Sequence, residues 1–194
     1  MSTRTMEHGL QRSPDVERAA ERLARPHARV ALVAKRVLDV VLALVLLIAV
    51  LPVVLVVLLM LGFAGEGVFE RRKRLGRHGR SVVLTRFQEL PGGAVGRWLE
   101  RVGARELPLL LTVLRGRLSF VGPRMVEPGT GSGHTGPRRL MAPGLIGPAQ
   151  LGHDEASENA LDDDYVERWS LWRDLQLLAG HRPAAHQSVS KSSS

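Results

Sequence analysis

The sequence predicts a mostly α fold with minor β, in which a proline-broken membrane helix is followed by a small soluble domain. Three observations predict this fold class. Residues 40–63 form a run without a charged side chain, apolar residues recur at helical spacing over 161–178, and one short segment, 82–87, has the composition of a strand. We therefore expect a polar, partly disordered extension, a membrane-inserted helix, a soluble domain and a disordered tail at residues 1–34, 35–64, 65–180 and 181–194.

The uncharged run is long enough for a membrane. As a helix with a rise of 1.5 Å per residue, residues 40–63 reach roughly 36 Å, which exceeds a hydrocarbon core of about 30 Å. The run begins too deep in the chain for a signal peptide and lacks a small-residue cleavage site. Pro52 stands in its middle, where the missing N–H and the ring favour a sharp kink.

Basic residues flank both ends of this run and leave two topologies open. Lys35 and Arg36 precede it, and the basic segment 71–80 follows it. Because basic residues favour the cytoplasmic side, both ends qualify for that side. A helix that enters one leaflet, bends at Pro52 and returns satisfies both flanks, whereas a kinked spanning helix satisfies only one. Asp39 lies one turn beyond Lys35 and Arg36, and we expect it to pair with either at the interface.

The composition narrows the choice of partners. The chain carries 27 Lys and Arg against 19 Asp and Glu, a formal net charge of +8, which favours an anionic partner such as a phospholipid surface or a phosphorylated ligand. Aromatic residues make up only 4%, too few for base-stacking surfaces, so we expect no nucleic acid partner. The absence of cysteine excludes disulfides, thiolate zinc sites and cysteine nucleophiles, and it fits a cytoplasmic location.

Helices are expected near both ends of the chain. Ser13 as N-cap and Pro14 in the first turn predict a surface helix over residues 15–25. Helical spacing predicts one amphipathic helix over 161–180, with the aspartates at 162–164 at its N-terminal end. Its apolar stripe is typical of core packing or of a position at the level of lipid headgroups, and consists of Leu161, Tyr165, Trp169, Trp172, Leu175 and Leu178.

A further helix is expected over residues 106–116, with Pro108 near its first turn and Gly116 at its end. Its first residue, Glu106, is a lone acid between Arg105 and an apolar run. Such an acid is either an ordinary charged helix start or part of a site for phosphates.

Six blocks of the sequence are weak signals singly, but their order and spacing are specific. They are KRVLDVVLALVLLIAVLP (35–52), GVFERRKRLGRHGR (67–80), VGRWLERVGARELP (95–108), VLRGRLSFVGPR (113–124), APGLIGPAQ (142–150) and DYVERWSLWRDL (164–175). Together they resemble the bacterial sugar transferase family, the membrane-monotopic polyprenol-phosphate phosphoglycosyl transferases.

The resemblance implies an activity and a topology. Such proteins move a sugar 1-phosphate from a UDP-sugar to polyprenol phosphate and release UMP, at the start of exopolysaccharide and other surface-glycan synthesis. The implied partners are a UDP-sugar, polyprenol phosphate and anionic lipid headgroups, while homo- or hetero-oligomerisation stays open. The resemblance also implies a re-entrant helix broken at Pro52, interfacial amphipathic helices, and a soluble domain on the cytoplasmic face of the inner membrane. The membrane segment would use Lys35, Arg36, Asp39 and Pro52.

The resemblance further implies a site built on an Asp-Glu pair at a helix start, with a nucleophilic Asp and a Glu that helps hold Mg²⁺. Glu106 matches the Glu and is the candidate catalytic and metal-binding residue, whereas Arg105 occupies the nucleophile position. Arginine stays protonated and cannot attack phosphorus, and beside Glu106 it is expected to weaken Mg²⁺ binding. The candidate contacts for substrate phosphate are Arg74, Arg77, Arg80, Arg86 and Arg124.

Three hypotheses follow. The first is an active transferase with a rearranged nucleophile, in which Glu106 attacks. The second is a catalytically silent homologue that binds lipid or nucleotide sugar or regulates a partner, which Arg105 and the apolar Leu109 at a polar family position favour. The third is a membrane-anchored basic protein whose arginines hold anionic headgroups. We expect the acids at 153–155 and 162–164 to be a solvated loop and a helix start rather than a replacement nucleophile.

Overall fold

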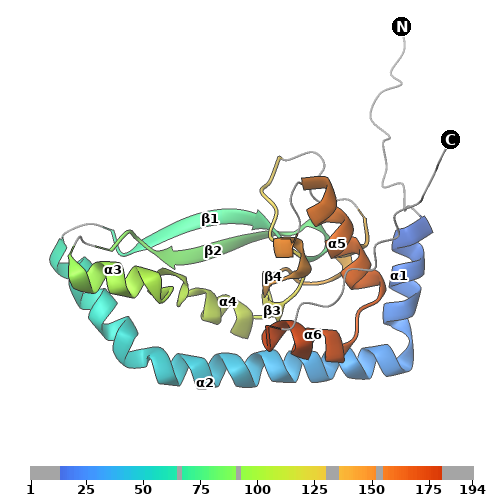
Figure 1. Cartoon of the computed structure of the whole chain (residues 1–194), viewed down its shortest axis with the longest axis horizontal. Helices are drawn as coiled ribbons and strands as arrows, with labels where there is room; N and C mark the ends of the chain where they lie inside the picture. The colour runs from blue at the N-terminus through green and yellow to red at the C-terminus, as the bar shows by residue number, and fades with distance from the viewer. Residues whose placement is uncertain (1–13, 65–66, 91–92, 130–135, 152–154, 181–194) are drawn as a thin grey trace, which may run out of the picture.

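One long helix, α2 (Pro26–Ala64), runs along the whole molecule, and the other elements pack on it (Figure 1). The computed structural model describes residues 14–64, 67–90, 93–129, 136–151 and 155–180. The expected N-cap Ser13, the tail at 181–194 and Asp154 of the acidic run lie outside the described residues.

The other elements are short, which confirms the expectation of a mostly helical chain with small sheets. In chain order they are α1 (Pro14–Ala24), β1 (Phe69–Leu75), the 3-10 turn η1 (Arg77–Gly79), β2 (Ser81–Phe87), α3 (Ala94–Arg101), η2 (Ala104–Glu106), α4 (Leu109–Leu114), β3 (Ser119–Val121), η3 (Pro137–Leu140), β4 (Gly144–Ile146), η4 (Pro148–Leu151), α5 (Glu155–Glu167) and α6 (Leu171–Leu178). The strand expected at 82–87 is β2, and the surface helix expected after Ser13 is α1.

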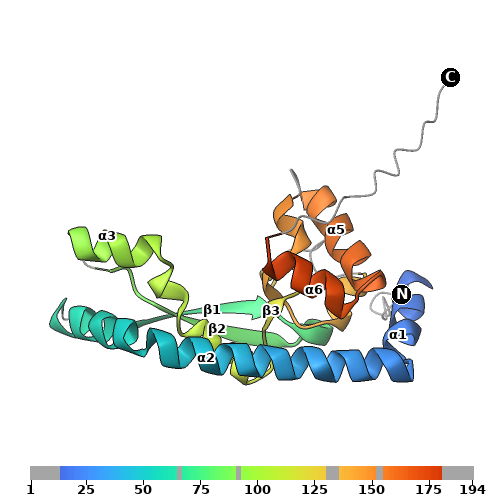
Figure 2. The same cartoon turned by 60° about the horizontal axis from the view of Figure 1, so that its bottom comes forward.

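α2 begins before the predicted membrane segment and is bent rather than broken. Pro26 occupies its first position, where a residue without an N–H is tolerated. Pro52 lies inside the helix, which continues to Ala64, and the ribbon bends in its C-terminal part in Figures 1 and 2. A proline removes one helical hydrogen bond and opens a bend, but later residues that pack on the domain keep the last turns helical. The predicted break at Pro52 is therefore wrong.

The outer face of α2 is apolar and exposed to the surroundings. It forms a stripe at helical spacing along the whole helix, which includes Val33, Val37, Val41, Leu44, Ile48, Leu55 and Leu59. Only 11% of the most apolar window of α2 is buried, unlike the core helix of a soluble protein. Within the described part of the chain, α2 is the one helix long and apolar enough to cross a membrane.

The inner face of α2 contributes to two separate cores. Its middle supplies Ala43 to a core shared with α4, β3 and α5, where Val113 and Tyr165 are fully buried. Its C-terminal part supplies Val57 and Leu61 to a second core with the end of β2 and with α3. Both halves of the helix therefore pack against the same soluble part of the chain.

The polar residues near the start of α2 attach it to the domain. Lys35 donates from its Nζ to Asp174 Oδ2 at 2.7 Å and to the carbonyl of Val121 at 2.8 Å. Asp39 accepts from Ser119 Oγ at 2.8 Å and from the next backbone N–H at 3.1 Å. The expected pairing of Asp39 with Lys35 or Arg36 is therefore wrong, because both of its oxygens face β3 instead of the membrane interface.

Arg36 makes the third attachment. Its guanidinium donates to the carbonyls of Val113 and Leu114 at 2.7 and 2.6 Å. These carbonyls belong to the last turn of α4, where helical C=O groups lack partners and a cation is favourable.

The β1–β2 hairpin is antiparallel, and in Figure 1 it lies above α2 with α3 and α4 between the two. Its register runs from Phe69 opposite Phe87 at the open end to Leu75 opposite Ser81 at the turn, a separation of about 20 Å for strands of this length. The open end adjoins η2, and the turn η1 adjoins η3. In the turn, His78 has a φ of 57°, in the left-handed region that non-glycine residues seldom adopt.

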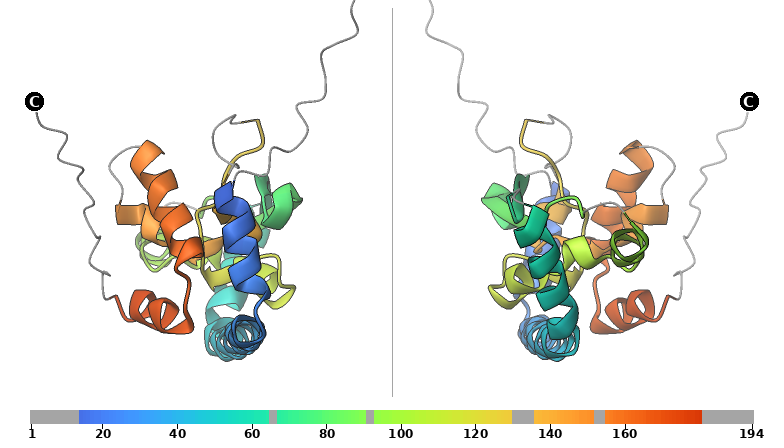
Figure 3. Two further views of the ribbon diagram at one scale, coloured as in Figure 1. Left: turned by 90° about the vertical axis from the view of Figure 1, so that its right-hand side faces the viewer. Right: turned by 90° about the vertical axis from the view of Figure 1, so that its left-hand side faces the viewer.

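The predicted C-terminal helix over 161–180 is two helices. α5 ends at Glu167, and Ser170 starts α6 as its N-cap by accepting a hydrogen bond from the backbone N–H of Arg173. Figure 3, which looks along α2, shows α6 in dark red beside α2, with α5 in orange further from it. The single-helix prediction is wrong because the apolar spacing continues across the break, while the extended Ser170 backbone ends the helix.

Candidate active site

η2 places Arg105 and Glu106 between the end of β2 and the start of α4. The helix predicted over 106–116 is shorter, since α4 begins at Leu109 with Pro108 as its N-cap, and Glu106 ends the preceding 3-10 turn. Gly116 follows the last turn with a φ of +73°, as expected for a residue just beyond a helix end.

Arg105 is held by two acceptors from the hairpin. Its Nη2 lies 3.3 Å from Glu70 Oε2, and its Nε donates to the carbonyl of Phe87 at 3.4 Å. Both side chains of the ion pair are about a quarter exposed, at 27% and 25%. The guanidinium of Arg105 therefore binds acceptors at the open end of the hairpin and does not pair with Glu106.

Glu106 faces a different cation. Its Oε1 lies 3.7 Å from Arg86 Nη1, an ion pair longer than a good hydrogen bond, and its side chain is 48% exposed. The carboxylate is thus loosely paired and reachable from outside. The predicted phosphate contact Arg86 does lie beside the predicted catalytic residue.

Glu70 is the site residue that sequence reasoning missed. It lies on β1 opposite Arg86 and binds both Arg72, at 2.5 Å, and Arg105. The hydrogen bond from Arg72 lowers the pKa of Glu70, and the charge of Arg105 adds to this effect. Its signal in the sequence was weak, because one acid ahead of a basic run gives no hint of a partner that is distant in the chain.

The remaining predicted phosphate contacts do not join this cluster. Arg74 forms an ion pair with Glu127, whereas Arg77 and Arg80 lie in the turn at the other end of the hairpin. Arg124 lies against α5, where it pairs with Glu158 and other residues of that helix. The structure therefore divides the predicted set among several places, and only Arg86 lies beside Glu106.

The acids at 162–164 have a structural setting that differs from the expected helix start. Asp162 is fully buried within α5 and accepts a hydrogen bond at 2.9 Å from the backbone N–H of Arg124. Burial raises the pKa of Asp162 to about 6. Asp163 accepts from the backbone N–H of Arg138 at 3.0 Å, and burial raises its pKa as well. These two acids fix the segment between β3 and β4 from the middle of α5, so their assignment as a helix start is wrong.

Magnesium, the cofactor that the resemblance implies, can be tested against the donors at this site. No group of three or more His, Cys, Asp or Glu side chains within the described residues is placed to hold one metal ion. Mg²⁺ at phosphate-handling sites keeps several waters and needs only one or two carboxylates together with phosphate oxygens. The half-exposed carboxylate of Glu106 fits a Mg²⁺ of that kind, bound together with a substrate phosphate.

Comparison with known proteins places this site in a family context. The family described as bacterial sugar transferase matches residues 30–186. A UDP-glucose:undecaprenyl-phosphate glucose-1-phosphate transferase of Caulobacter vibrioides is 32% identical over 89% of this chain and 77% of its own length.

Two further relatives have names of the same kind, a sugar phosphotransferase and an exopolysaccharide production protein. An undecaprenyl-phosphate glucose phosphotransferase of Komagataeibacter xylinus is 34% identical over 43% of this chain, and the match spans only 19% of that protein. The exopolysaccharide production protein ExoY of Rhizobium meliloti is 29% identical over 78% of this chain and 85% of its own length.

Proposed function

Because the chain belongs to the bacterial sugar transferase family, we propose that it transfers a sugar 1-phosphate from a UDP-sugar to polyprenol phosphate. The relatives named as undecaprenyl-phosphate sugar transferases and as exopolysaccharide proteins support this proposal. The observation that carries it is Glu106, a reachable carboxylate beside the guanidinium of Arg86, in a domain that packs on the apolar helix α2.

Glu106 is the proposed nucleophile. One carboxylate oxygen attacks the β-phosphorus of the UDP-sugar, the bond from this phosphorus to the bridging oxygen breaks, and UMP leaves with its electron pair. A phosphate oxygen of polyprenol phosphate then attacks the same phosphorus and releases the Glu106 carboxylate unchanged. Arg86 lies close enough to oppose the charge that develops on the phosphoryl oxygens.

Glu106 is also the proposed contact for Mg²⁺. A bound Mg²⁺ would supply further neutralisation of phosphoryl charge. The nearby guanidiniums of Arg86 and Arg105 supply fixed positive charge at the same place, so we propose that this chain binds the ion weakly in the absence of nucleotide.

The alternative is a catalytically silent homologue, and the Arg105–Glu70 ion pair favours it. Arg105 has no nucleophilic form, and Glu70 holds it at 3.3 Å in the hairpin. In this alternative the chain binds polyprenol phosphate or a UDP-sugar, or regulates a partner, without transferring the sugar.

Release of UMP separates the two candidates. The purified full chain is incubated with Mg²⁺, a panel of UDP-sugars and undecaprenyl phosphate. An active transferase releases UMP, and Glu106→Gln reduces the release by about a hundredfold or more. Glu89→Gln, which removes the same charge from an exposed position outside the cluster, leaves the release unchanged. Release that survives Glu106→Gln would exclude Glu106 as nucleophile, and no release from the wild type would favour the silent homologue.

We further propose that α2 enters the membrane and leaves it through the same face, with the soluble domain on the cytoplasmic side of the inner membrane. Its beginning binds β3 and α6 through Lys35 and Asp39, and its end packs against β2 and α3 through Val57 and Leu61. A helix whose two halves contact one domain cannot place its ends on opposite sides of a bilayer without losing one set of contacts. Basic residues on both flanks agree with this topology.

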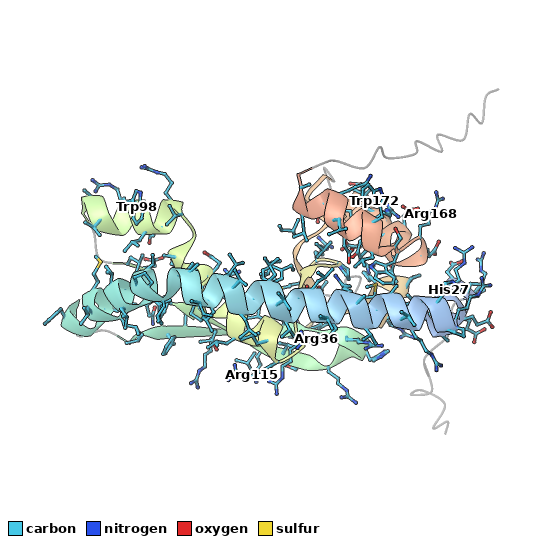
Figure 4. All side chains as sticks on the ribbon, turned by 90° about the horizontal axis from the view of Figure 1, so that it is seen from below. His27, Arg36, Trp98, Arg115, Arg168 and Trp172 are labelled. Carbon is cyan, nitrogen blue, oxygen red and sulfur yellow. The ribbon has the colours of Figure 1, made fainter. Side chains whose placement is uncertain are left out.

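Two short helices are the proposed interfacial elements. α3 exposes Val95 and Trp98 together with its C-cap Val102, and α6 exposes Trp172 and Leu175, in both cases at the spacing of one helix face. Figure 4 shows Trp98 and Trp172 on the same side of α2. Exposed tryptophan on a short amphipathic helix favours the level of lipid headgroups.

Cysteine labelling tests the topology, and a chain without cysteine suits it. Glu17→Cys lies on α1 before the membrane helix, and Arg71→Cys lies on β1 after it. An impermeant maleimide added to cells should label neither residue until the membrane is permeabilised. Labelling of one residue in intact cells would show a spanning helix instead.

A further inference from the structure

A cavity lies at the turn end of the hairpin, away from Glu106. It is an open cavity of about 480 Å³ lined by α1, the N-terminal part of α2, η1, η3 and residues beside β3. An adjoining hollow of about 520 Å³ shares Arg77, His78 and Gly116 with it and extends to Arg80 and Arg117. We call the two together the turn cavity.

Two cations of the lining are already bound, Lys35 to Asp174 and Arg36 to the end of α4, whereas the exposed arginines of the turn cavity lack carboxylate partners among the described residues. Arg29, Arg77, Arg80 and Arg117 are exposed, and none has an ion pair with another described residue. The acid in the lining, Asp39, is already bound by β3. The turn cavity therefore presents uncompensated positive charge, the condition under which an anion gains most from binding.

The turn itself is strained at the cavity wall. His78 adopts a positive φ of 57° and lines both hollows. Burial lowers its pKa, and the charges of Arg77 and Arg80 lower it further, as expected where positive potential accumulates. A sparsely populated backbone conformation beside a cavity is typical of a binding site.

The opposite wall of the turn cavity is apolar. Ala20, Leu23 and Leu32 line it from α1 and α2, and Leu118 and Met141 line it from the loops beside β3 and β4. The lining contains no Phe, Tyr or Trp on which a nucleobase could stack. A ligand that suits both walls carries a phosphate at one end and an aliphatic chain at the other.

The turn cavity adjoins the face of α2 that we place in the membrane, because residues of its lining neighbour residues of the apolar stripe. Arg29, Leu32 and Arg36 line the cavity. Val33 and Val37 belong to the exposed apolar stripe, and each follows a lining residue directly, Leu32 and Arg36. Consecutive residues of a helix are about 100° apart around its axis, so the stripe borders the cavity. Figure 4 shows Arg36 and Arg115 on the other side of α2 from Trp98 and Trp172. An acyl chain can therefore pass from this cavity into the lipid that surrounds the stripe.

We propose that the turn cavity binds an anionic phospholipid of the host membrane, with its phosphodiester on Arg77, Arg80 and Arg117 and an acyl chain along the apolar wall. The proposal rests on the membrane attachment of α2 but not on sugar transfer. Because Glu106 lies at the other end of the hairpin, the phospholipid occupies a place that the proposed substrates do not need.

The test measures binding of dihexanoyl-phosphatidylglycerol to the full chain in a zwitterionic detergent, by isothermal titration calorimetry. Replacing both turn arginines in Arg77→Gln/Arg80→Gln should weaken binding by about 30-fold, because the loss of each charge weakens binding by roughly tenfold or less. Arg71→Gln/Lys73→Gln is the matched control, because it removes two exposed charges from the same hairpin outside the cavity. The control should change the affinity by less than about twofold.

A second variant keeps every charge. Ala20→Trp fills the mouth of the turn cavity from α1 and should weaken phosphatidylglycerol binding by about tenfold or more, while circular dichroism shows an unchanged fold. Glu106→Gln should bind as the wild type does, so a failure of sugar transfer cannot be mistaken for a failure of lipid binding.

Four results would overturn the proposal. They are equal losses in the matched control, equally tight binding of dihexanoyl-phosphatidylcholine, unchanged binding by Ala20→Trp, and displacement of the lipid by UDP or inorganic phosphate at the same concentration. The last result would assign the cavity to a soluble phosphate compound.

Discussion

Arginines lie at both ends of the β1–β2 hairpin, but those of the turn itself lack the carboxylate partners that the arginines of the open end have. There Glu70 holds Arg72 and Arg105, and Glu106 faces Arg86. At the turn, Arg77 and Arg80 have no such partner among the described residues. The comparison teaches that a count of arginines does not locate an anion site, since their partners decide how much positive charge is left for a ligand.

The largest loss of stability is expected when a buried cation that is part of an ion pair is removed. Lys35 and Asp174 have side chains only 10% and 4% exposed, and Tyr165 also donates to the same carboxylate. Lys35→Met leaves that carboxylate buried without its cation, which should cost about 3–5 kcal/mol of unfolding free energy. Thermal or denaturant unfolding in detergent measures it.

The control for this prediction is the exposed pair on α1. Arg18→Met removes the partner of Asp15, with side chains 72% and 51% exposed, and should change stability by less than about 1 kcal/mol. Equal effects of the two variants would mean that burial does not set the value of a charge pair in this protein.

The second prediction concerns Asp162, a carboxyl buried without a cation bonded to its side chain. Its folded-state pKa of about 6 lies above its ordinary value of 3.8, so the folded chain binds the proton more tightly. Stability should therefore fall as pH rises from about 4 to about 6, by roughly 3 kcal/mol. Asp162→Asn should remove this slope and Asp15→Asn should not, in unfolding curves measured across that range. A slope that persists in Asp162→Asn would assign the titration to another group.

The third prediction inverts the charge at the open end. Arg105→Asp removes a guanidinium and places a second acid next to Glu106, which should raise UMP release by about tenfold or more. Arg101→Asp makes the same change of charge on exposed α3 and should leave the release as it was. A folded Arg105→Asp chain with unchanged release would show that Arg105 is not what limits transfer.

The smallest change in stability is expected when the Glu70 carboxylate is removed. Its pKa is lowered, first by the hydrogen bond from Arg72, so the stability that it contributes is present above its ordinary pKa and is lost as pH falls through the folded value. Glu70→Gln should flatten the acid side of the pH–stability curve, below about pH 4.3. A steeper acid side in this variant would contradict the pairing. The sign is opposite to that of Asp162.

Local patterns sufficed for several elements of the fold. The uncharged run predicted α2, the composition of residues 82–87 predicted β2, and Pro14 predicted the start of α1. Gly116 also ends α4 in the left-handed conformation expected of it. Each of these features depends on residues that are close together in the chain, so a single sequence is enough to predict it.

Long-range partners were not accessible in the same way. Asp39 was expected to bind its helical neighbours, yet it binds Ser119, and Lys35 binds Asp174, which is 139 residues away. Glu70 passed unnoticed because its importance comes from Arg105, brought to it by the fold. The aspartates at 162–164 resembled a helix start only because nothing local shows that Asp162 is buried against the turn at Arg124.

The most direct test of the proposed mechanism is the covalent intermediate. The full chain is incubated with Mg²⁺ and the UDP-sugar that supports UMP release, without polyprenol phosphate, and its intact mass is measured. Attack by Glu106 predicts an increase by one sugar phosphate, located on the peptide that contains Glu106, lost on addition of undecaprenyl phosphate and absent from Glu106→Gln. Release of UMP without any adduct, or an adduct that persists in Glu106→Gln, would contradict the assignment of Glu106 as the nucleophile.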